Sequence, residues 1–183
     1  MNSDPIYTQR LTIERFTKEH LSARYVSWLN DPRVVRYSEQ RHRTHTLDTC
    51  RAYMESFEGT HHLFWAILEK DGDFGHVGNI NAYLDVQNGV ADMGILMGET
   101  RIRGLGYGTE AWLGVCDFLF ERKKVRKITA GTISVNCTMV RIMEKAGMVE
   151  DGIRRKHCMW EGLEVDVVHR ALFREQWVKK SGG

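Results

Sequence analysis

The chain has 183 residues, of which 42% are hydrophobic and 27% charged, as in ordinary soluble globular proteins. Its net charge of +2 is too small to indicate a nucleic-acid or anionic-membrane partner, and no apolar run approaches the roughly 20 residues of a membrane span. Residues 1–15 lack the apolar core of a secretory signal, and the four cysteines are scattered without a C-x-x-C pair. We therefore expect a cytoplasmic protein without a structural metal.

Apolar patterning in the first half predicts four strands and two helices. Alternating or continuous apolar runs predict strands at 11–13, 63–68, 77–84 and 90–97. Helical spacing predicts helices at 21–29 and 47–57, stopped by Asn30-Asp31-Pro32 and by Gly59. Asn88-Gly89 is a strong hairpin signal between the last two strands.

The second half continues in the same mixed pattern. Helical stripes predict helices at 111–120 and 136–146, and Gly147 is a natural stop for the second. Strands are expected at 127–134, 149–159 and 163–173, the last two joined across Glu161-Gly162. The resulting order, β-α-α-β-β-β-α-β-α-β-β, predicts an α/β (α+β) fold with a mixed sheet flanked by helices.

A basic, glycine-rich loop connects strand 90–97 to the following helix. Gly104, Gly106 and Gly108 let the backbone turn sharply and leave no Cβ to block a ligand. The loop leads into a helix N-terminus, where free N–H groups and the positive end of the dipole favour a phosphate. Arg101 and Arg103 add full positive charges. The pattern indicates a pyrophosphate cradle; the alternative is a plain turn with solvated arginines.

The spacing of the glycines and their neighbours distinguishes between different kinds of phosphate-binding loop. A P-loop places Lys-Ser/Thr after its last glycine, whereas Thr109-Glu110 follow Gly108 here. A dinucleotide-binding fingerprint needs a third glycine where Thr109 stands. The pattern Arg-x-x-Gly-x-Gly, formed by Arg103, Gly106 and Gly108, resembles the acyl-CoA pyrophosphate loop of the GCN5-related N-acetyltransferase (GNAT) superfamily.

The resemblance extends over almost the whole chain. It is carried by Thr8-Gln-Arg10-Leu11, Trp28-Leu-Asn-Asp31-Pro32, Asn136 with Glu144-Lys145-Ala-Gly147-Met148, Asp151-Gly152 with Arg155, and Gly162 with Asp166. Several of these segments resemble the RimJ/RimL-type branch. The resemblance implies one GNAT domain over residues 1–183, with its core at about 6–176.

The same resemblance implies an acetyl-CoA-dependent N-acetyltransferase that acts directly on a primary amine. The acceptor is expected to be a protein N-terminal α-amine, or the amine of an amino sugar or another small molecule. A non-catalytic acyl-CoA-binding module is the alternative, and a homodimer is left open.

In the GNAT fold, the strand before the loop splays from its neighbour and leaves backbone groups free around Leu96 and Met97. Pantetheine can bond to these groups like an added strand, and an N–H there can polarise the thioester carbonyl. Asn136 reaches pantetheine in the superfamily, although it also suits a simple helix N-cap. The residues expected to bind CoA are Leu96, Met97, Arg101, Arg103, Gly104, Leu105, Gly106, Tyr107, Gly108, Thr109 and Asn136.

The usual acid and base residues of the superfamily are missing. Met143 stands where many members place a tyrosine acid, Met139 where RimL-type members place a serine, and Gly131 near a strand glutamate. Proton transfer therefore goes through water or other residues. Replacement bases to consider are Asp92, Glu99, His76, His157 and Asp166, each of which is otherwise solvated or ion-paired.

Asp92 is the first choice for a catalytic base, because it lies on the strand leading into the loop; Asn136 is the second catalytic candidate. A lysine amine has a pKa of about 10.4 and an α-amine about 7.7–8.0, so a missing strong base favours an α-amine or an amino sugar. Arg41-His42-Arg43-Thr-His45 forms a basic segment that either meets a phosphate-bearing acceptor, such as a nucleotide-linked amino sugar, or is simply solvated.

Overall fold

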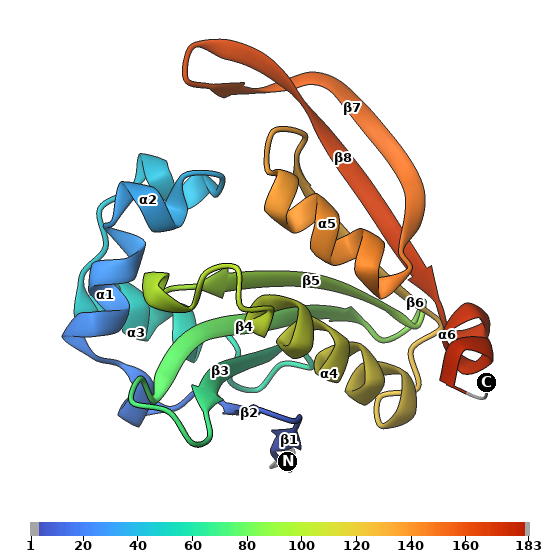
Figure 1. Cartoon of the computed structure of the whole chain (residues 1–183), viewed down its shortest axis with the longest axis horizontal. Helices are drawn as coiled ribbons and strands as arrows, with labels where there is room; N and C mark the ends of the chain where they lie inside the picture. The colour runs from blue at the N-terminus through green and yellow to red at the C-terminus, as the bar shows by residue number, and fades with distance from the viewer. Residues whose placement is uncertain (1–3, 182–183) are drawn as a thin grey trace.

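The computed structural model describes residues 4–181, and its centre is one sheet of eight strands in the order β1-β2-β3-β4-β5-β6-β8-β7 (Figure 1). The strands are β1 (Ile6–Tyr7), β2 (Leu11–Arg15), β3 (Leu63–Glu69), β4 (His76–Asp85), β5 (Val90–Met97), β6 (Lys127–Ile133), β7 (Val149–Trp160) and β8 (Leu163–Phe173). The helices are α1 (Ala23–Leu29), α2 (Pro32–Val35), α3 (Leu47–Glu55), α4 (Tyr107–Glu121), α5 (Cys137–Ala146) and α6 (Arg174–Ser181). Short 3-10 helices are η1 (Lys18–His20), η2 (Glu39–His42) and η3 (Thr100–Ile102). The predicted mixed α/β architecture is confirmed.

The sheet is antiparallel except where β5 meets β6. These two strands run parallel and pair only from Val90–Asp92 to Lys127–Thr129. On its other edge, β5 pairs with β4 along its whole length. The strands therefore diverge after Asp92, as the splay expected beside the glycine loop requires.

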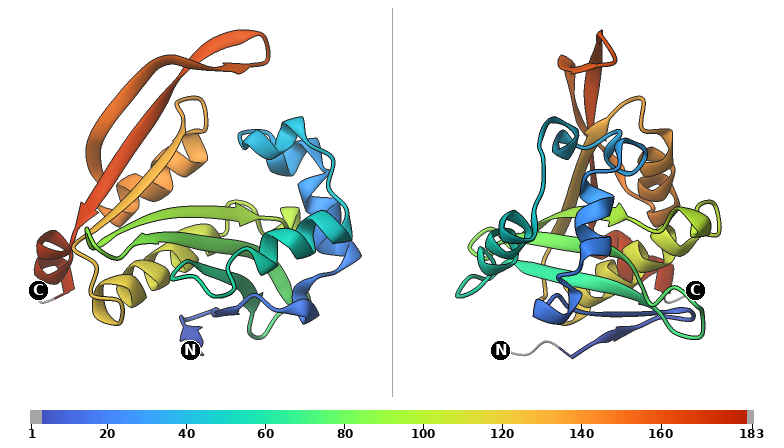
Figure 2. Two further views of the ribbon diagram at one scale, coloured as in Figure 1. Left: turned by 180° about the vertical axis from the view of Figure 1, so that it is seen from behind. Right: turned by 90° about the vertical axis from the view of Figure 1, so that its left-hand side faces the viewer.

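Helices cover both faces of the sheet, with α4 and α3 on opposite sides (Figure 2). Side chains of successive strand residues point to opposite faces, so Trp65 packs with α4 while its neighbour Phe64 packs with α1 and α3. The first cluster is built around Trp112 of α4 and Met143 of α5, and the second around Trp28 of α1. The sheet is therefore stabilised by one apolar cluster on each of its two faces.

The β7–β8 hairpin is long and curves over α5 towards α2 (Figure 1). At its tip, the Trp160 indole donates to the Arg36 carbonyl oxygen over 3.3 Å, and its ring stacks on Tyr37 with centroids 5.8 Å apart. The adjacent Glu161 carboxylate pairs with the Arg36 guanidinium at 3.0 Å. The hairpin therefore forms an arch that joins the two ends of the fold; we call residues 159–161 the hairpin tip.

The predicted strands and helices are present, and the differences are additions. The first predicted helix ends at Leu29, yet Asp31-Pro32 opens α2 immediately afterwards. Asp31 acts as an N-cap, accepting from the Arg33 N–H over 2.8 Å, and proline suits the first helical position. The sequence patterns did not predict β1 or α6. In residues 4–181, no helix is long and apolar enough to cross a membrane.

Candidate functional site

The glycine loop has the backbone geometry that the sequence predicts for a phosphate cradle. Gly106 is the N-cap of α4 with φ +86°, and Gly104 has φ +80°, left-handed conformations that favour glycine. No atom lies within 4 Å of the position of a Cβ on Gly104. Because Gly106 has no side chain to cap the helix, the N–H groups of the first turn of α4 remain available to a ligand.

Three residues outside the predicted site, Arg10, Glu69 and Glu110, fix this loop in place. The Arg10 Nε donates to Glu110 Oε2 over 2.7 Å, and Arg10 Nη1 donates to the Leu105 carbonyl oxygen over 2.9 Å. The Tyr107 ring lies 4.3 Å from the same guanidinium, and its hydroxyl donates to Glu69 over 2.6 Å. The segment Thr8-Gln-Arg10-Leu11 had signalled a family resemblance, but spacing alone did not connect Arg10 with the loop about a hundred residues away.

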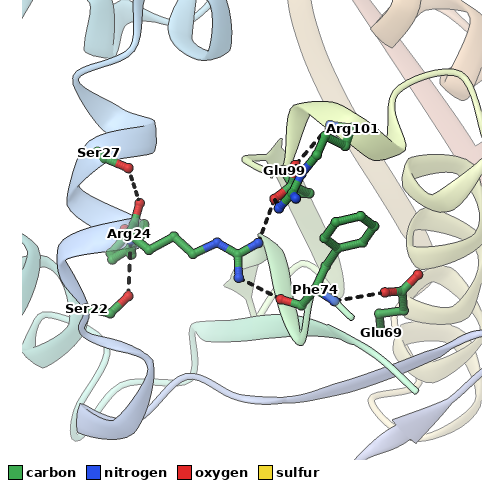
Figure 3. A network of polar contacts seen from close by, with 8 residues as sticks. Ser22, Arg24, Ser27, Glu69, Phe74, Glu99 and Arg101 are labelled. Atoms are coloured by element: carbon green, nitrogen blue, oxygen red, sulfur yellow. Dashed lines mark hydrogen bonds and ion pairs between the residues drawn. The ribbon is translucent and has the colours of Figure 1, made fainter. Parts of the chain in front are cut away.

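The two arginines of the loop have different surroundings. The Arg101 guanidinium is held by Glu99, with its Nη2 2.9 Å from Oε2, and lies 4.2 Å from the Phe74 ring (Figure 3). Glu99 also accepts from Arg24 of α1 over 2.7 Å. Arg103 is exposed, its Nη2 donates to the Arg33 carbonyl oxygen over 2.9 Å, and its charge adds to that of Arg33 in lowering the pKa of Asp31. Among the described residues, no carboxylate lies within ion-pair distance of its guanidinium. Arg103 is therefore the loop arginine that is free to meet a phosphate.

The open edge of β5 presents backbone groups towards the gap beside β6. Backbone groups of successive residues point to opposite edges of a strand, and the Gly89 carbonyl faces β6 whereas the Gly98 N–H faces β4. This alternation directs the groups of Ile95 and Met97 into the gap and those of Leu96 towards β4. The free backbone groups expected around Leu96 and Met97 are therefore those of Met97 and Ile95, and not those of Leu96.

Asn136 is the N-cap of α5. Its Oδ1 accepts from the Met139 N–H over 3.2 Å, and its Nδ2 donates to the Thr132 hydroxyl over 3.0 Å. The capping role that the sequence left open is therefore present. The amide lies on the β6 side of the gap, since Thr132 belongs to β6 and α5 follows it.

Two of the candidate bases, Glu99 and Asp166, are held by positively charged partners. Hydrogen bonds from Arg101, assisted by Arg24, lower the pKa of the buried Glu99 from 4.5 to about 2. The N–H of Lys156 and the guanidinium of Arg155 likewise lower the pKa of Asp166. A carboxylate held in this way is a poor proton acceptor, so Glu99 and Asp166 are less suited to act as a base than an unpaired carboxylate.

The other three candidates differ in access. Asp92 is exposed, and its Oδ1 accepts from the Thr129 hydroxyl over 2.6 Å at the point where β5 and β6 diverge. His76 packs on Trp28 with ring centroids 5.0 Å apart, and burial lowers its pKa to about 4. His157 is exposed on the long hairpin. Among these residues, only Asp92 stands at the fork of the sheet.

The residues that stand where the family's acid and base residues are missing, Met143, Met139 and Gly131, lie in packed parts of the structure. Met143 is fully buried in the core, and Met139 packs against the same cluster. A Cβ on Gly131 would lie 2.9 Å from Nδ1 of His169, so the imidazole occupies the space above this glycine. His169 lies on β8, and the pairing of β6 with β8 brings it opposite Gly131.

The basic segment 41–45 lies after α2, within and beyond η2. The Arg41 guanidinium pairs with Glu39 at 2.9 Å and donates to the Met159 carbonyl of the hairpin tip over 3.2 Å. Arg43 is exposed. In the described part of the chain, no group of three or more His, Cys, Asp or Glu residues is arranged to hold a metal ion.

Comparison with known proteins agrees with this geometry. Residues 10–149 match the family model described as acetyltransferase (GNAT) domain. The chain is 24% identical to the uncharacterized N-acetyltransferase YnaD of Bacillus subtilis (strain 168), over 94% of this chain and 98% of that protein.

Solved structures show the same fold at low sequence identity. Spermidine N-acetyltransferase from Vibrio cholerae, in complex with CoA and spermine, superposes with a TM-score of 0.82 at 15% identity, covering 93% of this chain and 99% of that one. The ribosomal L7/L12 α-N-protein acetyltransferase RimL, in complex with coenzyme A, gives a TM-score of 0.81 at 11% identity over 94% and 99%.

Proposed function

Since the chain belongs to the acetyltransferase (GNAT) domain family, we propose that it uses acetyl-CoA as donor and transfers the acetyl group directly to a primary amine. The acceptor is an α-amine of a protein N-terminus, an amino sugar or another small amine. We also infer a single domain over residues 1–183 within the RimJ/RimL-type branch. A non-catalytic acyl-CoA-binding module is not favoured, because the relatives reported above are named as acetyltransferases.

The observation that carries this proposal is the meeting of a glycine-capped helix with the divergence of β5 and β6. In the proposed complex, the N–H groups of residues 104–109 and the Arg103 guanidinium hold the pyrophosphate. The pantetheine arm runs into the gap between β5 and β6, against the free backbone groups of Met97 and Ile95. Asn136, on the other side of the gap, orients the same arm.

The chemistry requires little from the protein beyond positioning. The amine nitrogen attacks the thioester carbonyl carbon, a C–N bond forms, the C–S bond breaks, and the leaving thiolate takes a proton. A backbone N–H at the open edge of β5 stabilises the charge that develops on the carbonyl oxygen. Asp92, at the fork of the sheet, removes the proton from the amine directly or through water.

A backbone substitution in the cradle tests the proposal. Gly106→Val places a β-branched residue at φ +86° and obstructs the backbone approach to pyrophosphate, so we expect it to abolish CoA binding measured by calorimetry. Gly59→Val is the matched control, because Gly59 also has a positive φ (+69°) with open space around it, but lies after α3. Circular dichroism establishes that both variants are folded. Unchanged CoA affinity in a folded Gly106→Val protein would refute the cradle.

A further inference from the structure

A cavity of about 340 Å³ lies between the α2–η2 region and the hairpin tip. Its walls come from segments more than a hundred residues apart in the sequence, which the arch brings together. Leu29 and Val35 supply apolar surface, and Trp160 closes the side formed by the hairpin. The glycine loop contributes no residue to this lining, so the cavity is distinct from the proposed pyrophosphate cradle.

Three arginines line the cavity, against one carboxylate. Arg36 pairs with that carboxylate, Glu161, at 3.0 Å, which leaves its charge largely compensated. Arg41 is mostly buried, pairs with Glu39 at 2.9 Å and is held by two carbonyl oxygens. For Arg43, the contacts of the described residues include no ion pair. The cavity therefore has an excess of positive charge in a protein whose whole net charge is only +2.

Aromatic and backbone contacts fix the positions of two of these guanidinium groups, those of Arg36 and Arg41. The Arg36 guanidinium lies 5.0 Å from the Trp160 ring, which stacks on Tyr37. Arg41 is fixed through its bonds to the Ser38 and Met159 carbonyls. A planar guanidinium held in advance loses little entropy when it binds an oxyanion, and several forks around one cavity match the several oxygens of a phosphate.

The cavity is also adjacent to the proposed acyl-CoA site through α2. Pro32 lines the cavity, and the next residue, Arg33, offers its carbonyl oxygen to Arg103 of the glycine loop at 2.9 Å. A molecule that enters beside α2 therefore lies next to the element that touches the cradle. This placement suits the second substrate of a two-substrate enzyme.

We propose that this cavity binds the phosphate group of a phosphate-bearing amine acceptor, such as a phosphorylated or nucleotide-linked amino sugar. The identification of the bound molecule as the acceptor rests on the proposed acetyltransferase function. Arg43 makes the main charge-assisted contact, Arg36 and Arg41 complete the anion site, and Trp160 forms one wall. A protein N-terminus without a phosphate does not use this site.

Binding of inorganic pyrophosphate tests the anion site without reference to catalysis. CoA is titrated first. This titration tests the acyl-CoA assignment by itself, and it fills the glycine loop so that pyrophosphate cannot bind there. Pyrophosphate is then titrated into the CoA-saturated protein, the Arg43→Ala variant and the control Arg15→Ala, which removes an exposed arginine at the end of β2. We expect binding at one site, a loss of affinity of about tenfold or more in Arg43→Ala, and no change in Arg15→Ala. Absence of binding, or equal affinity in all three proteins, overturns the site.

A matched pair of amines tests the acceptor assignment. Glucosamine 6-phosphate and glucosamine differ only in the phosphate, and both are offered with acetyl-CoA. We expect a KM at least about tenfold lower for the phosphorylated sugar, a difference that shrinks in Arg43→Ala while the KM for acetyl-CoA stays constant. Equal KM values for the two sugars, or failure of glucosamine 6-phosphate to be acetylated while pyrophosphate binds, overturns the assignment as an acceptor site.

Discussion

The Glu99 carboxylate lies in the fork of the Arg101 guanidinium, with Nε 2.8 Å from Oε1 and Nη2 2.9 Å from Oε2. A second guanidinium, that of Arg24 in α1, approaches Oε2 at 2.7 Å. One buried carboxylate thus ties the start of the glycine loop to the first helix (Figure 3). Without that negative charge, the two arginines would face each other uncompensated.

Removal of the Glu99 charge should destabilise the fold. We expect Glu99→Gln to lower the free energy of unfolding by about 1–3 kcal/mol at pH 7, because a buried acceptor of two charged donors is lost. The carboxyl has a folded pKa of about 2 against an ordinary 4.5, so its contribution is complete above about pH 4.5 and disappears as the pH falls towards 2. Urea denaturation between pH 2 and pH 7 measures both effects. The control Glu121→Gln, at an exposed pair with Lys124, should change stability little; an equal loss there would contradict the argument.

The two loop arginines should contribute unequally to CoA affinity. Arg103→Ala should weaken CoA binding by about 1.5–3 kcal/mol, since its guanidinium is free to form a charge-assisted bond to phosphate. Arg101→Ala should weaken it by less than about 1 kcal/mol, because Glu99 already compensates the charge. Calorimetric titration of CoA compares the two. An unchanged affinity in Arg103→Ala would mean a solvated arginine.

Activity should not depend on a proton donor at position 143. Met143 is fully buried in the core, so Met143→Leu conserves shape and should leave the turnover number within about a few-fold of the original. Steady-state kinetics with saturating acetyl-CoA measures this. A loss of about a thousand-fold with intact CoA binding would give the position a role in catalysis that packing does not explain.

The carboxylate of Asp92 should matter to the rate if it accepts the proton. Asp92→Asn keeps the shape and the Thr129 contact but removes the base, and should lower the turnover number on the order of a hundred-fold. The rate of the original protein should rise with pH until the acceptor amine has lost its proton. Full activity with an unshifted pH profile would make Asp92 structural. Preference for lysine side chains over α-amines and amino sugars would contradict the inference from the missing strong base.

The glycine under His169 should be required for packing. Gly131→Ala brings a Cβ to 2.9 Å from the imidazole Nδ1, and the expected loss of stability is about 1–3 kcal/mol. In a His169→Ala background, the same substitution should cost much less, since the overlapping ring is gone. Thermal or urea unfolding of the four proteins gives the coupling energy. Additive losses would show that the ring and the glycine do not interact.

Local signals predicted most elements of the fold. Asn88-Gly89, Gly147 and Gly162 marked turns and a helix end that the structure contains, because their conformations depend on the residues themselves. The sharp turn of the glycine loop could be predicted for the same reason, since Gly104 and Gly106 adopt positive φ values that favour glycine. The helix opened by Pro32 was missed, because the same residues that end α1 also cap α2.

Partners distant in the sequence could not be predicted. Glu99 looked like a candidate base from its position, and only the fold brings Arg24 to it from 75 residues away. Arg10 and Glu110 are separated by 100 residues, so no spacing rule connects them. The anion cavity likewise depends on the hairpin tip reaching Arg36 and Arg41.

The contact between the hairpin tip and α2 joins residues 124 and 125 positions apart, Trp160 and Glu161 with Arg36. The exposed ion pair in this contact contributes only about 0–1 kcal/mol, and the tip adds to it one stacked ring pair and two hydrogen bonds of 3.2 and 3.3 Å. These few contacts must offset the entropy lost when the tip is held against α2. The arch is therefore expected to assemble last during folding and to have a small free energy of opening in the native state. Amide hydrogen exchange should be fast at the tip and slow in β3, β4 and α4, where the core holds the chain.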